Sequence, residues 1–320
     1  MKKVAGKVAF ITAGASGIGW GMARAFMNAG MKVVVADILQ DHIEECRSQY
    51  PGKADLHFIR LDVSNRPQME SAAREVEDRF GRLDVLCNNA GVAARGQVDD
   101  AGYADWDYVM GVCVGGTING LVNFLPLIKK HGEGGHVVTT SSMAGMIPVP
   151  FNGLYSTAKF AVRGMMDALR LSLGPHKIGV SVLCPGFVAT RATTAGDRYR
   201  AEHDGKPLHE HRDAAKAGMD PLKVGERVLQ SILDNELYIF PHGEFKEEVR
   251  AYFDRMLAAF PEDFNATADK GRLDIERGRM TRTEEARRIA AAIDGVEVEE
   301  PSVAATVDAW MRRSSSIGPI

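Results

Sequence analysis

Residues 7–26, KVAFITAGASGIGWGMARAF, run from a short apolar stretch through a glycine-rich turn into a helical pattern. The apolar stretch favours a buried β-strand. Gly14, Gly17 and Gly19 lie between strand and helix, where backbone N–H groups at a helix N-terminus can meet the pyrophosphate of a dinucleotide. A side chain there would hold the phosphates away from the backbone. The stretch therefore predicts the start of a dinucleotide-binding domain, although any tight turn would also suit glycines.

Seven strand-like runs alternate with helical patterns through the first 240 residues. Most runs are apolar throughout, as expected for strands covered by helices on both faces. The alternation predicts a doubly wound α/β fold of the Rossmann type, with a parallel sheet of right-handed crossovers. We expect strands at 7–12, 32–37, 56–62, 83–91, 135–142, 179–186 and 236–241, and helices at 18–29, 67–80, 105–130, 155–174 and 221–234.

The alternation ends near residue 243, which predicts one domain over 1–243 and a C-terminal helical extension over 244–320. A Thr-x-x-Glu capping box at 281–284 and a capping Ser302 indicate two weaker helices in the extension. Disorder of 261–320 is the alternative. Residues 244–260 place on one helical stripe Phe245, Val249, Phe253, Met256, Leu257 and Phe260.

Composition favours a soluble globular protein, with 45% hydrophobic and 25% charged residues among 320. The formal net charge of −3 gives no electrostatic reason to expect nucleic acid or an anionic membrane as a partner. The first apolar run is too brief for a secretory signal, and no run of 18 apolar residues follows. No metal or disulfide is expected, because no C-x-x-C pair occurs among Cys46, Cys87, Cys113 and Cys184. We therefore expect a cytoplasmic protein.

Asp37 ends the second predicted strand, 18 residues after Gly19. A carboxylate there accepts hydrogen bonds from the adenosine ribose hydroxyls and repels a 2′-phosphate. No arginine or lysine occurs at 13–19 or 38–40 to receive that phosphate. The sequence therefore favours NAD over NADP as cofactor, the alternative for Asp37 being a solvated strand end.

Six short motifs follow one another in order: TAGASGIG (12–19), LDVS (61–64), NNAG (88–91), TTSSMAG (139–145), YSTAK (155–159) and CPGFVAT (184–190). Together they resemble those of the short-chain dehydrogenase/reductase family, over about residues 1–241. The resemblance implies an oxidoreductase that assembles as a homodimer or homotetramer through the helices at 105–130 and 155–174.

The resemblance also implies how the cofactor is held. Asp62 would cap the adenine amino group, and the backbone of Val188 and the hydroxyl of Thr190 would hold the carboxamide. Tyr155 and Lys159 are both predicted to bind the cofactor, with Lys159 on the nicotinamide ribose. The remaining predicted cofactor-binding residues are Gly14, Ser16, Gly17, Ile18, Gly19, Asp37, Ile38, Val63, Asn89, Ala90, Gly91, Pro185 and Gly186.

Tyr155 and Lys159 lie four residues apart in a predicted helix, which places them on one face. A tyrosine with an ordinary pKa of about 10 is a poor base near neutrality, and a neighbouring ammonium favours its phenolate. We predict that Tyr155 takes the proton of an alcohol as hydride leaves, while Ser142 holds the substrate oxygen. Exposed polar residues on a helix are the alternative.

Two positions depart from the family pattern. Ala13 stands where the family has its first glycine, and a slight shift of the loop is expected. Cys113 stands where the family has an active-site asparagine associated with a helix kink and a water chain to the lysine. Cys113 is counted among the catalytic candidates, although its thiol is not expected to copy the bonds of an amide. A small buried filler is the alternative.

The substrate is expected to be a hydrophobic, possibly aromatic, secondary alcohol or ketone. Residues 105–126 and 234–257 resemble a bacterial branch that includes dehydrogenases of benzylic alcohols in lignin-derived aryl ethers. A polar lid is predicted over 191–220, in which His203, His209 and His211 are solvated and bind no metal. The predicted pocket wall comprises Val92, Ala93, Met143, Pro148, Phe151 and Asn152, although these residues could also pack only the loop.

Two other functions remain open from the sequence. The first is a lyase, isomerase or dehydratase that keeps the fold and the tyrosine, which Cys113 alone favours. The second is a protein that binds NAD without turnover, against which Ser142, Tyr155 and Lys159 argue.

Overall fold

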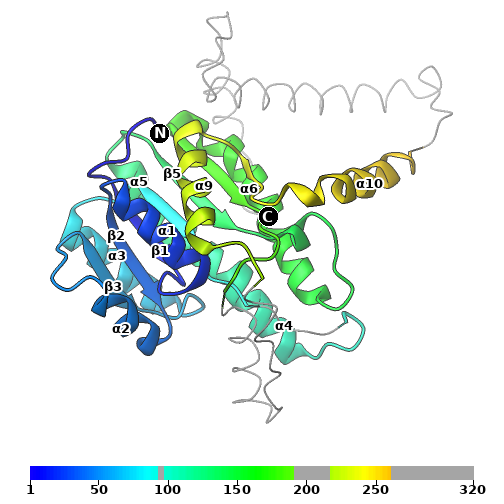
Figure 1. The fold of residues 1–320 in the computed structure, drawn as a ribbon, viewed down its shortest axis with the longest axis horizontal. Coiled ribbons are helices and arrows are strands. Elements are labelled where there is room, and N and C mark those ends of the chain that lie inside the picture. The colour runs from blue at the N-terminus through cyan, green and yellow to red at the C-terminus, as the bar shows by residue number, and fades with distance from the viewer. Residues whose placement is uncertain (93–96, 191–216, 261–320) are drawn as a thin grey trace, which may run out of the picture.

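Seven parallel strands form one sheet in the order β3-β2-β1-β4-β5-β6-β7 in the computed structural model, which describes residues 1–92, 97–190 and 217–260 (Figure 1). The predicted seven-stranded Rossmann-type fold is confirmed. The order reverses between β1 and β4, and ligands of such sheets bind outside the carboxyl ends of the strands at this switch point. The strands are β1 (Val8–Thr12), β2 (Lys32–Asp37), β3 (Leu56–Arg60), β4 (Val85–Asn88), β5 (Gly135–Thr140), β6 (Ile178–Leu183) and β7 (Tyr238–Ile239).

Helices cover both faces of the sheet (Figure 1). One face carries α1 (Gly17–Asn28), α2 (Gln40–Ser48) and α9 (Pro221–Asp234). The other carries α3 (Arg66–Phe80), α5 (Gly116–Lys130) and α6 (Gly153–Leu173). The predicted helices are thus present, whereas α2 was not predicted, since it is short and buries only Ile43 and Cys46.

Strand β1 shows why the apolar runs specify this layered arrangement. Ala9 and Ile11 pack with one cluster, and Val8 and Phe10 pack with the cluster on the opposite face. Phe10 stacks on Phe124 of α5 with ring centroids 4.0 Å apart. Because each buried large apolar side chain contributes about 1.5–3 kcal/mol, both faces of β1 hold helices firmly against the strands that end at the switch point.

The predicted helix at 244–260 is present as α10 (Lys246–Leu257), which follows a 3₁₀ turn, η4 (Gly243–Phe245), and projects from the body of the domain (Figure 1). Its apolar stripe is divided. Phe245, Val249 and Phe253 pack against the core, whereas the apolar side chains toward its end, Met256, Leu257 and Phe260, are exposed. The capping box at 281–284 and Ser302 lie outside the described residues.

Within the described part of the chain, one helical stretch is long and apolar enough to cross a membrane, judged by length and composition alone. This stretch, Tyr103–Lys130, includes α5. Phe124 and Ile128 of α5 pack in the core beneath the sheet, and such core helices of soluble proteins often pass the same test. The stretch is therefore weak evidence for a membrane span.

His136 in β5 gives the fold a predicted sensitivity to acid. Its Nε2 lies 2.7 Å from Oγ of Ser181, whose hydroxyl donates to the carbonyl of Glu236. Ser181 therefore accepts from a protonated Nε2, and Nδ1 is buried without a partner among the described residues. Burial lowers the pKa of His136 from 6.5 to about 3.

Between pH 6.5 and about pH 3 the unfolded chain binds a proton at His136 that the folded chain does not. The free energy of unfolding should therefore fall as the pH falls through this window, by up to about 1.4 kcal/mol per pH unit from this group. The decrease in the free energy of unfolding from pH 7 to pH 4.5, measured by urea unfolding, should be smaller for His136→Phe than for the wild type. The control variant His57→Gln should show the wild-type decrease. A wild-type decrease in His136→Phe would refute the role of His136 in the acid sensitivity.

Candidate active site

The glycine-rich turn joins β1 to α1 in a conformation that depends on its glycines. Gly17 has φ +49°, and a Cβ there would lie 2.8 Å from Cγ2 of Thr190. A Cβ on Gly19 would overlap the carbonyl of Ala13. Ser16 precedes the helix without a side-chain cap. Together with the neighbouring Ile18, these residues form a cradle that fits a pyrophosphate at the helix N-terminus.

Ala13 adopts φ +47°, in the left-handed region that favours glycine. Its neighbour Gly14 donates its N–H to the carbonyl of Ala36 at 2.9 Å. A Cβ on Gly14 would lie 2.8 Å from the carbonyl oxygen of Ile11. The loop thus keeps a glycine-like backbone at Ala13 at the cost of local strain, which is how the departure from the family pattern is accommodated.

Asp37 ends β2 directly behind this loop. Its two carboxylate oxygens accept the N–H groups of Ala15 and Leu39, each at 3.1 Å. Asp37 is only 5% exposed, so the alternative of a solvated strand end is wrong. Burial raises the pKa of the carboxyl, opposed by the hydrogen bonds from Leu39 and Ala15. The next residue, Ile38, is exposed.

The segment after β3 is anchored by α5. Asp62 accepts both the N–H and the hydroxyl of Ser64, at 2.9 and 2.7 Å. The carbonyl of Val63 accepts Nδ2 of Asn119 at 2.8 Å. Asp62 is partly exposed at the carboxyl end of its strand, on the sheet edge where the glycine loop also lies.

Two threonines that the sequence did not single out join the strand ends. The hydroxyl of Thr12 accepts the N–H groups of Asn89 and Ala90, both at 2.9 Å. Asn89 donates Nδ2 to the carbonyl of Thr12 at 3.1 Å and accepts the hydroxyl of Thr140 at 2.9 Å. These bonds connect β1, β4 and β5 and draw residues 89–91 out of the predicted strand 83–91, so β4 ends at Asn88.

Tyr155 and Lys159 meet on one face of α6, as predicted. Nζ of Lys159 lies 5.4 Å from the centroid of the Tyr155 ring and donates to the carbonyl of Thr140 at 2.8 Å. Lys159 is 2% exposed, which excludes the alternative of an exposed lysine. A Cβ on Gly91 would lie 2.9 Å from Nζ, so the backbone after β4 passes directly beside the ammonium.

Ser142 is brought to α6 by the residues around it. Oγ of Ser141 donates to the carbonyl of Lys159 at 2.8 Å, and Oγ of Ser156 accepts the N–H of Val149 at 3.1 Å. Ser142 begins the 3₁₀ turn η2 (Met143–Gly145), where its Oγ accepts the N–H of Ala144 at 3.1 Å. Because that oxygen is an acceptor in this bond, the hydroxyl proton remains available to donate.

The helix predicted over 105–130 is interrupted at Cys113. A π-helical turn, η1 (Gly111–Gly115), joins α4 (Tyr103–Met110) to α5, and such turns are frequent at functional sites. Sγ of Cys113 lies 3.4 Å from both the backbone nitrogen and the oxygen of Val92. The buried thiol therefore acts as both a donor and an acceptor. It lies near Gly91, where an added Cβ would be 3.6 Å from Sγ and 2.9 Å from Nζ of Lys159.

This geometry predicts that Cys113 acts by holding the backbone beside Lys159. Cys113→Ala should lower kcat about tenfold, because the backbone of Val92 loses both hydrogen bonds to the thiol. Cys113→Ser keeps a donor and acceptor and should stay within about threefold of the wild type. Steady-state kinetics on both folded variants check this. A serine variant as inactive as the alanine variant would instead indicate chemistry that requires sulfur.

The segment after β6 reaches back to the glycine loop. Val188 forms a parallel bridge to Met219, and Thr190 packs on Gly17. The N–H of Gly186, which follows Pro185, donates to Nδ1 of His242 at 3.0 Å. Sequence reasoning missed His242, since it lies 56 residues from Gly186 in a predicted loop.

The predicted substrate residues lie in different environments. Phe151 is 74% exposed, so it does not simply pack the loop, and Pro148 is also exposed. Asn152 is partly buried, and its Oδ1 has no partner among the described residues. Met143 is buried in the core cluster. Ala93 and residues 191–216 of the predicted lid (191–220), including its three histidines, lie outside the described residues.

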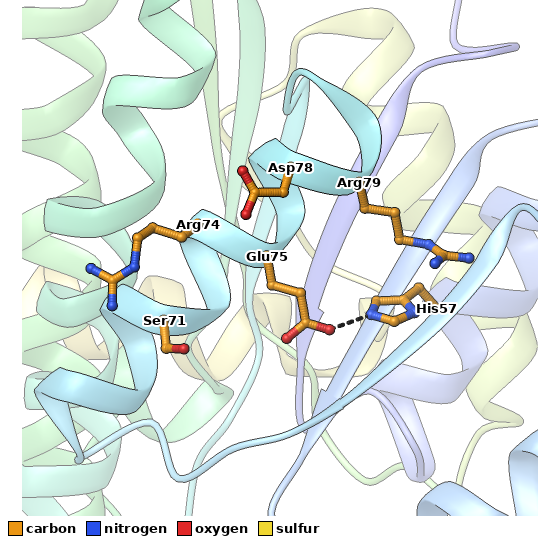
Figure 2. Close-up of a pocket in the computed structure, with 6 residues that line it drawn as sticks. All are labelled: His57, Ser71, Arg74, Glu75, Asp78 and Arg79. Atoms are coloured by element: carbon orange, nitrogen blue, oxygen red, sulfur yellow. Dashed lines mark hydrogen bonds and ion pairs between the residues drawn. The ribbon is translucent and has the colours of Figure 1, made fainter.

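A separate surface hollow lies beside α3, lined by His57, Ser71, Arg74, Glu75, Asp78 and Arg79 (Figure 2). His57 lies near the amino end of β3, and its Nε2 is 2.6 Å from Oε1 of Glu75. The residues described above follow the carboxyl ends of the strands instead. The hollow is therefore a solvated, charged face outside the candidate active site.

The chain is similar in sequence to known proteins. The sequence model of the family described as short chain dehydrogenase matches residues 7–200. A "C alpha-dehydrogenase" of Sphingobium sp. strain SYK-6 is 35% identical over 266 residues, covering 80% of this chain and 87% of the relative.

Two solved structures extend the likeness to three dimensions. A chain from Novosphingobium aromaticivorans, titled as a short-chain dehydrogenase, is 38% identical with a TM-score of 0.76, covering 89% of this chain and 99% of that one. A short chain dehydrogenase/reductase from Burkholderia phymatum in complex with NAD is 30% identical with a TM-score of 0.72, covering 83% and 100%. The fold, the ordered motifs and these matches establish that the chain belongs to the short-chain dehydrogenase/reductase family of oxidoreductases.

Proposed function

We propose that this protein is an NAD-dependent oxidoreductase that interconverts a secondary alcohol and a ketone by hydride transfer. The observation that carries the proposal is the buried Lys159, whose ammonium lies beside the Tyr155 ring and donates to the Thr140 carbonyl. An ammonium has three N–H donors. Among the described residues, Nζ of Lys159 donates one hydrogen bond, to the carbonyl oxygen of Thr140. The other donors suit the hydroxyls of the nicotinamide ribose.

In this mechanism Tyr155 is the acid or base and Ser142 holds the reacting oxygen. The ammonium of Lys159 stabilises the phenolate of Tyr155, which removes the hydroxyl proton of the alcohol. The hydroxyl of Ser142 donates to the substrate oxygen and stabilises the charge that develops there. NAD, when bound, supplies the hydride acceptor. In ketone reduction, Tyr155 returns the proton to the oxygen.

The residues at the switch point fit NAD rather than NADP. The clearances at Gly17 and Gly19 suit a pyrophosphate, and the buried Asp37 carboxylate at the end of β2 would repel a 2′-phosphate on a bound dinucleotide. Within the described residues next to Asp37, the exposed Ile38 offers no positive charge. The relative from Burkholderia phymatum binds NAD, which supports the same choice.

The substrate that the surroundings favour is a hydrophobic, aromatic secondary alcohol. Phe151 and Val149, in the connection between Ser142 and Tyr155, are exposed, as is Phe187 after β6. Aromatic side chains in such positions can stack on a substrate ring. Both the relative named "C alpha-dehydrogenase" and the resemblance to benzylic alcohol dehydrogenases agree with this class.

We also propose that the protein is a cytoplasmic homodimer or homotetramer, with no nucleic acid or membrane partner. Ile118 and Val122 of α5 and Leu171 of α6 are large apolar side chains on the outer surface, with Val122 66% exposed. A second copy of the chain would bury these side chains. Analytical ultracentrifugation should show a dimer or tetramer, and a monomer at micromolar concentration would contradict this assembly.

Absorbance at 340 nm tests the function. The protein should produce NADH from NAD with some member of a panel of benzylic and alicyclic secondary alcohols, and NADP should be much poorer. Substrate conversion without a change in NADH would favour the lyase, isomerase or dehydratase alternative. NAD affinity without conversion of any alcohol or ketone in the panel would favour the binding-protein alternative.

A further inference from the structure

His242 holds both ends of the Gly186–Phe187 segment after β6. Its Nδ1 accepts the N–H of Gly186 at 3.0 Å, and its Nε2 lies 3.0 Å from the carbonyl oxygen of Phe187. An N–H group can only donate and a carbonyl can only accept. The two backbone partners therefore require a neutral imidazole with its proton on Nε2.

The imidazole is enclosed, so this arrangement is part of the fold. His242 is buried, and the ring of Phe245 packs edge-on against it with centroids 6.3 Å apart. A Cβ on Gly186 would lie 2.5 Å from Cε2 of Phe245 and 3.1 Å from Cγ of His242. Only a residue without a side chain at 186 allows the backbone to approach both rings.

Fixing the Phe187 carbonyl also fixes the direction of the next N–H. No cis peptide bond occurs in the described residues, and in a trans peptide the C=O and the following N–H point in opposite directions. The N–H of Met219 donates to the same Phe187 carbonyl at 3.0 Å. Both donors therefore lie on one side of the peptide, and the N–H of Val188 points to the other.

Val188 lies between two anchored neighbours on the segment that reaches the glycine loop. Ala189 donates its N–H to the carbonyl of Met219 at 3.0 Å, and Thr190 packs on Gly17. The structure gives the N–H of Val188 no partner among the described residues. The N–H of Val188 thus points away from Met219 and is available to donate a hydrogen bond.

We propose that His242 is a positioning residue that aims the N–H of Val188 at the carboxamide of the nicotinamide. The inference rests on the proposed NAD site and adds a residue 56 positions from the segment it orders. It predicts that His242 affects the nicotinamide half of the cofactor and leaves the adenosine half unaffected. ADP-ribose lacks only the nicotinamide, so it is the matched probe.

Isothermal titration of NAD and ADP-ribose into His242→Phe tests the proposal. The phenyl ring retains the packing on Phe245 but makes neither hydrogen bond. The Kd of NAD should rise about tenfold, the effect of losing about one hydrogen bond, whereas the Kd of ADP-ribose should change less than twofold. Control variant Phe245→Leu keeps both hydrogen bonds of His242 and should lower the NAD affinity much less.

Equal changes in the two Kd values, or no change in either, would overturn the role of His242. If His242→Phe does not fold, amide chemical shifts of the wild-type protein decide. NAD should shift the Val188 amide proton strongly and ADP-ribose should not, and equal shifts with both ligands would overturn the proposal. A wild-type protein that binds neither ligand would instead overturn the proposed NAD site itself.

Discussion

Tyr155→Phe is expected to lower kcat for alcohol oxidation by about 10³-fold, within the range of 10²–10⁴ that general acid–base catalysis contributes. The phenylalanine ring keeps the packing over Lys159 but has no hydroxyl to accept the proton. The Kd of NAD should change little, because we propose that the ammonium of Lys159 makes the main contact with the nicotinamide ribose. Stopped-flow measurement of NADH formation by the purified variant checks the fall in kcat. Titration of the same variant with NAD checks that the Kd is nearly unchanged.

Tyr238→Phe is the matched control for this experiment. The hydroxyl of Tyr238 in the edge strand β7 donates to Asp167 at 2.6 Å, so this variant likewise loses one phenol hydroxyl. It should keep wild-type kcat. If Tyr155→Phe retained turnover within a few-fold of this control, the proton would have to leave by another group, and the role of Tyr155 would be lost.

Asp37→Asn is expected to reduce the preference for NAD over NADP by at least about tenfold in kcat/KM. A carboxylate about 4 Å from a phosphate charge costs roughly 4 kcal/mol at an effective dielectric of 20, and the amide removes this repulsion. The carbonyl oxygen of asparagine can still accept the N–H of Ala15 or Leu39, so the loop should persist. Kinetics with both cofactors measure the ratio.

The preference for NAD over NADP should also depend on pH, in the direction set by the shifted pKa of Asp37. Burial raises the pKa of the Asp37 carboxyl, so the free protein neutralises it at a higher pH than an exposed aspartate. The discrimination against NADP should weaken as the pH falls in wild-type protein and stay flat in Asp37→Asn. Asp41→Asn, an exposed neighbour in α2, is the control. A wild-type cofactor ratio in Asp37→Asn would show that another group sets the preference.

The sheet could be predicted from sequence because its strands are locally distinctive. Apolar runs such as 32–37 and 135–142 are buried on both faces, so composition alone separates them from the amphipathic helices. The π turn at Cys113 could not be predicted from helical periodicity, because a single widened turn leaves the flanking apolar pattern intact. Helix α2 was missed for a related reason, as two buried residues make too short a pattern.

The site was predictable where it depends on local spacing and unpredictable where it depends on distant contacts. The four-residue spacing of Tyr155 and Lys159 places them on one helix face from sequence alone. Thr12 and Thr140 act through Asn89, at separations of 77 and 51 residues. His242 acts on Gly186 across 56 residues. No local pattern marks such partners, because the folded sheet creates their proximity.

The central claim is that hydride passes directly from a carbinol carbon to the nicotinamide. The measurement that tests it is turnover of a secondary benzylic alcohol deuterated at the carbinol carbon, followed by mass spectrometry and NMR of the reduced cofactor. The account predicts one deuterium at C4 of the nicotinamide for each ketone formed, with none released to water. Ketone formed without deuterated NADH, or with the label in solvent, would contradict it.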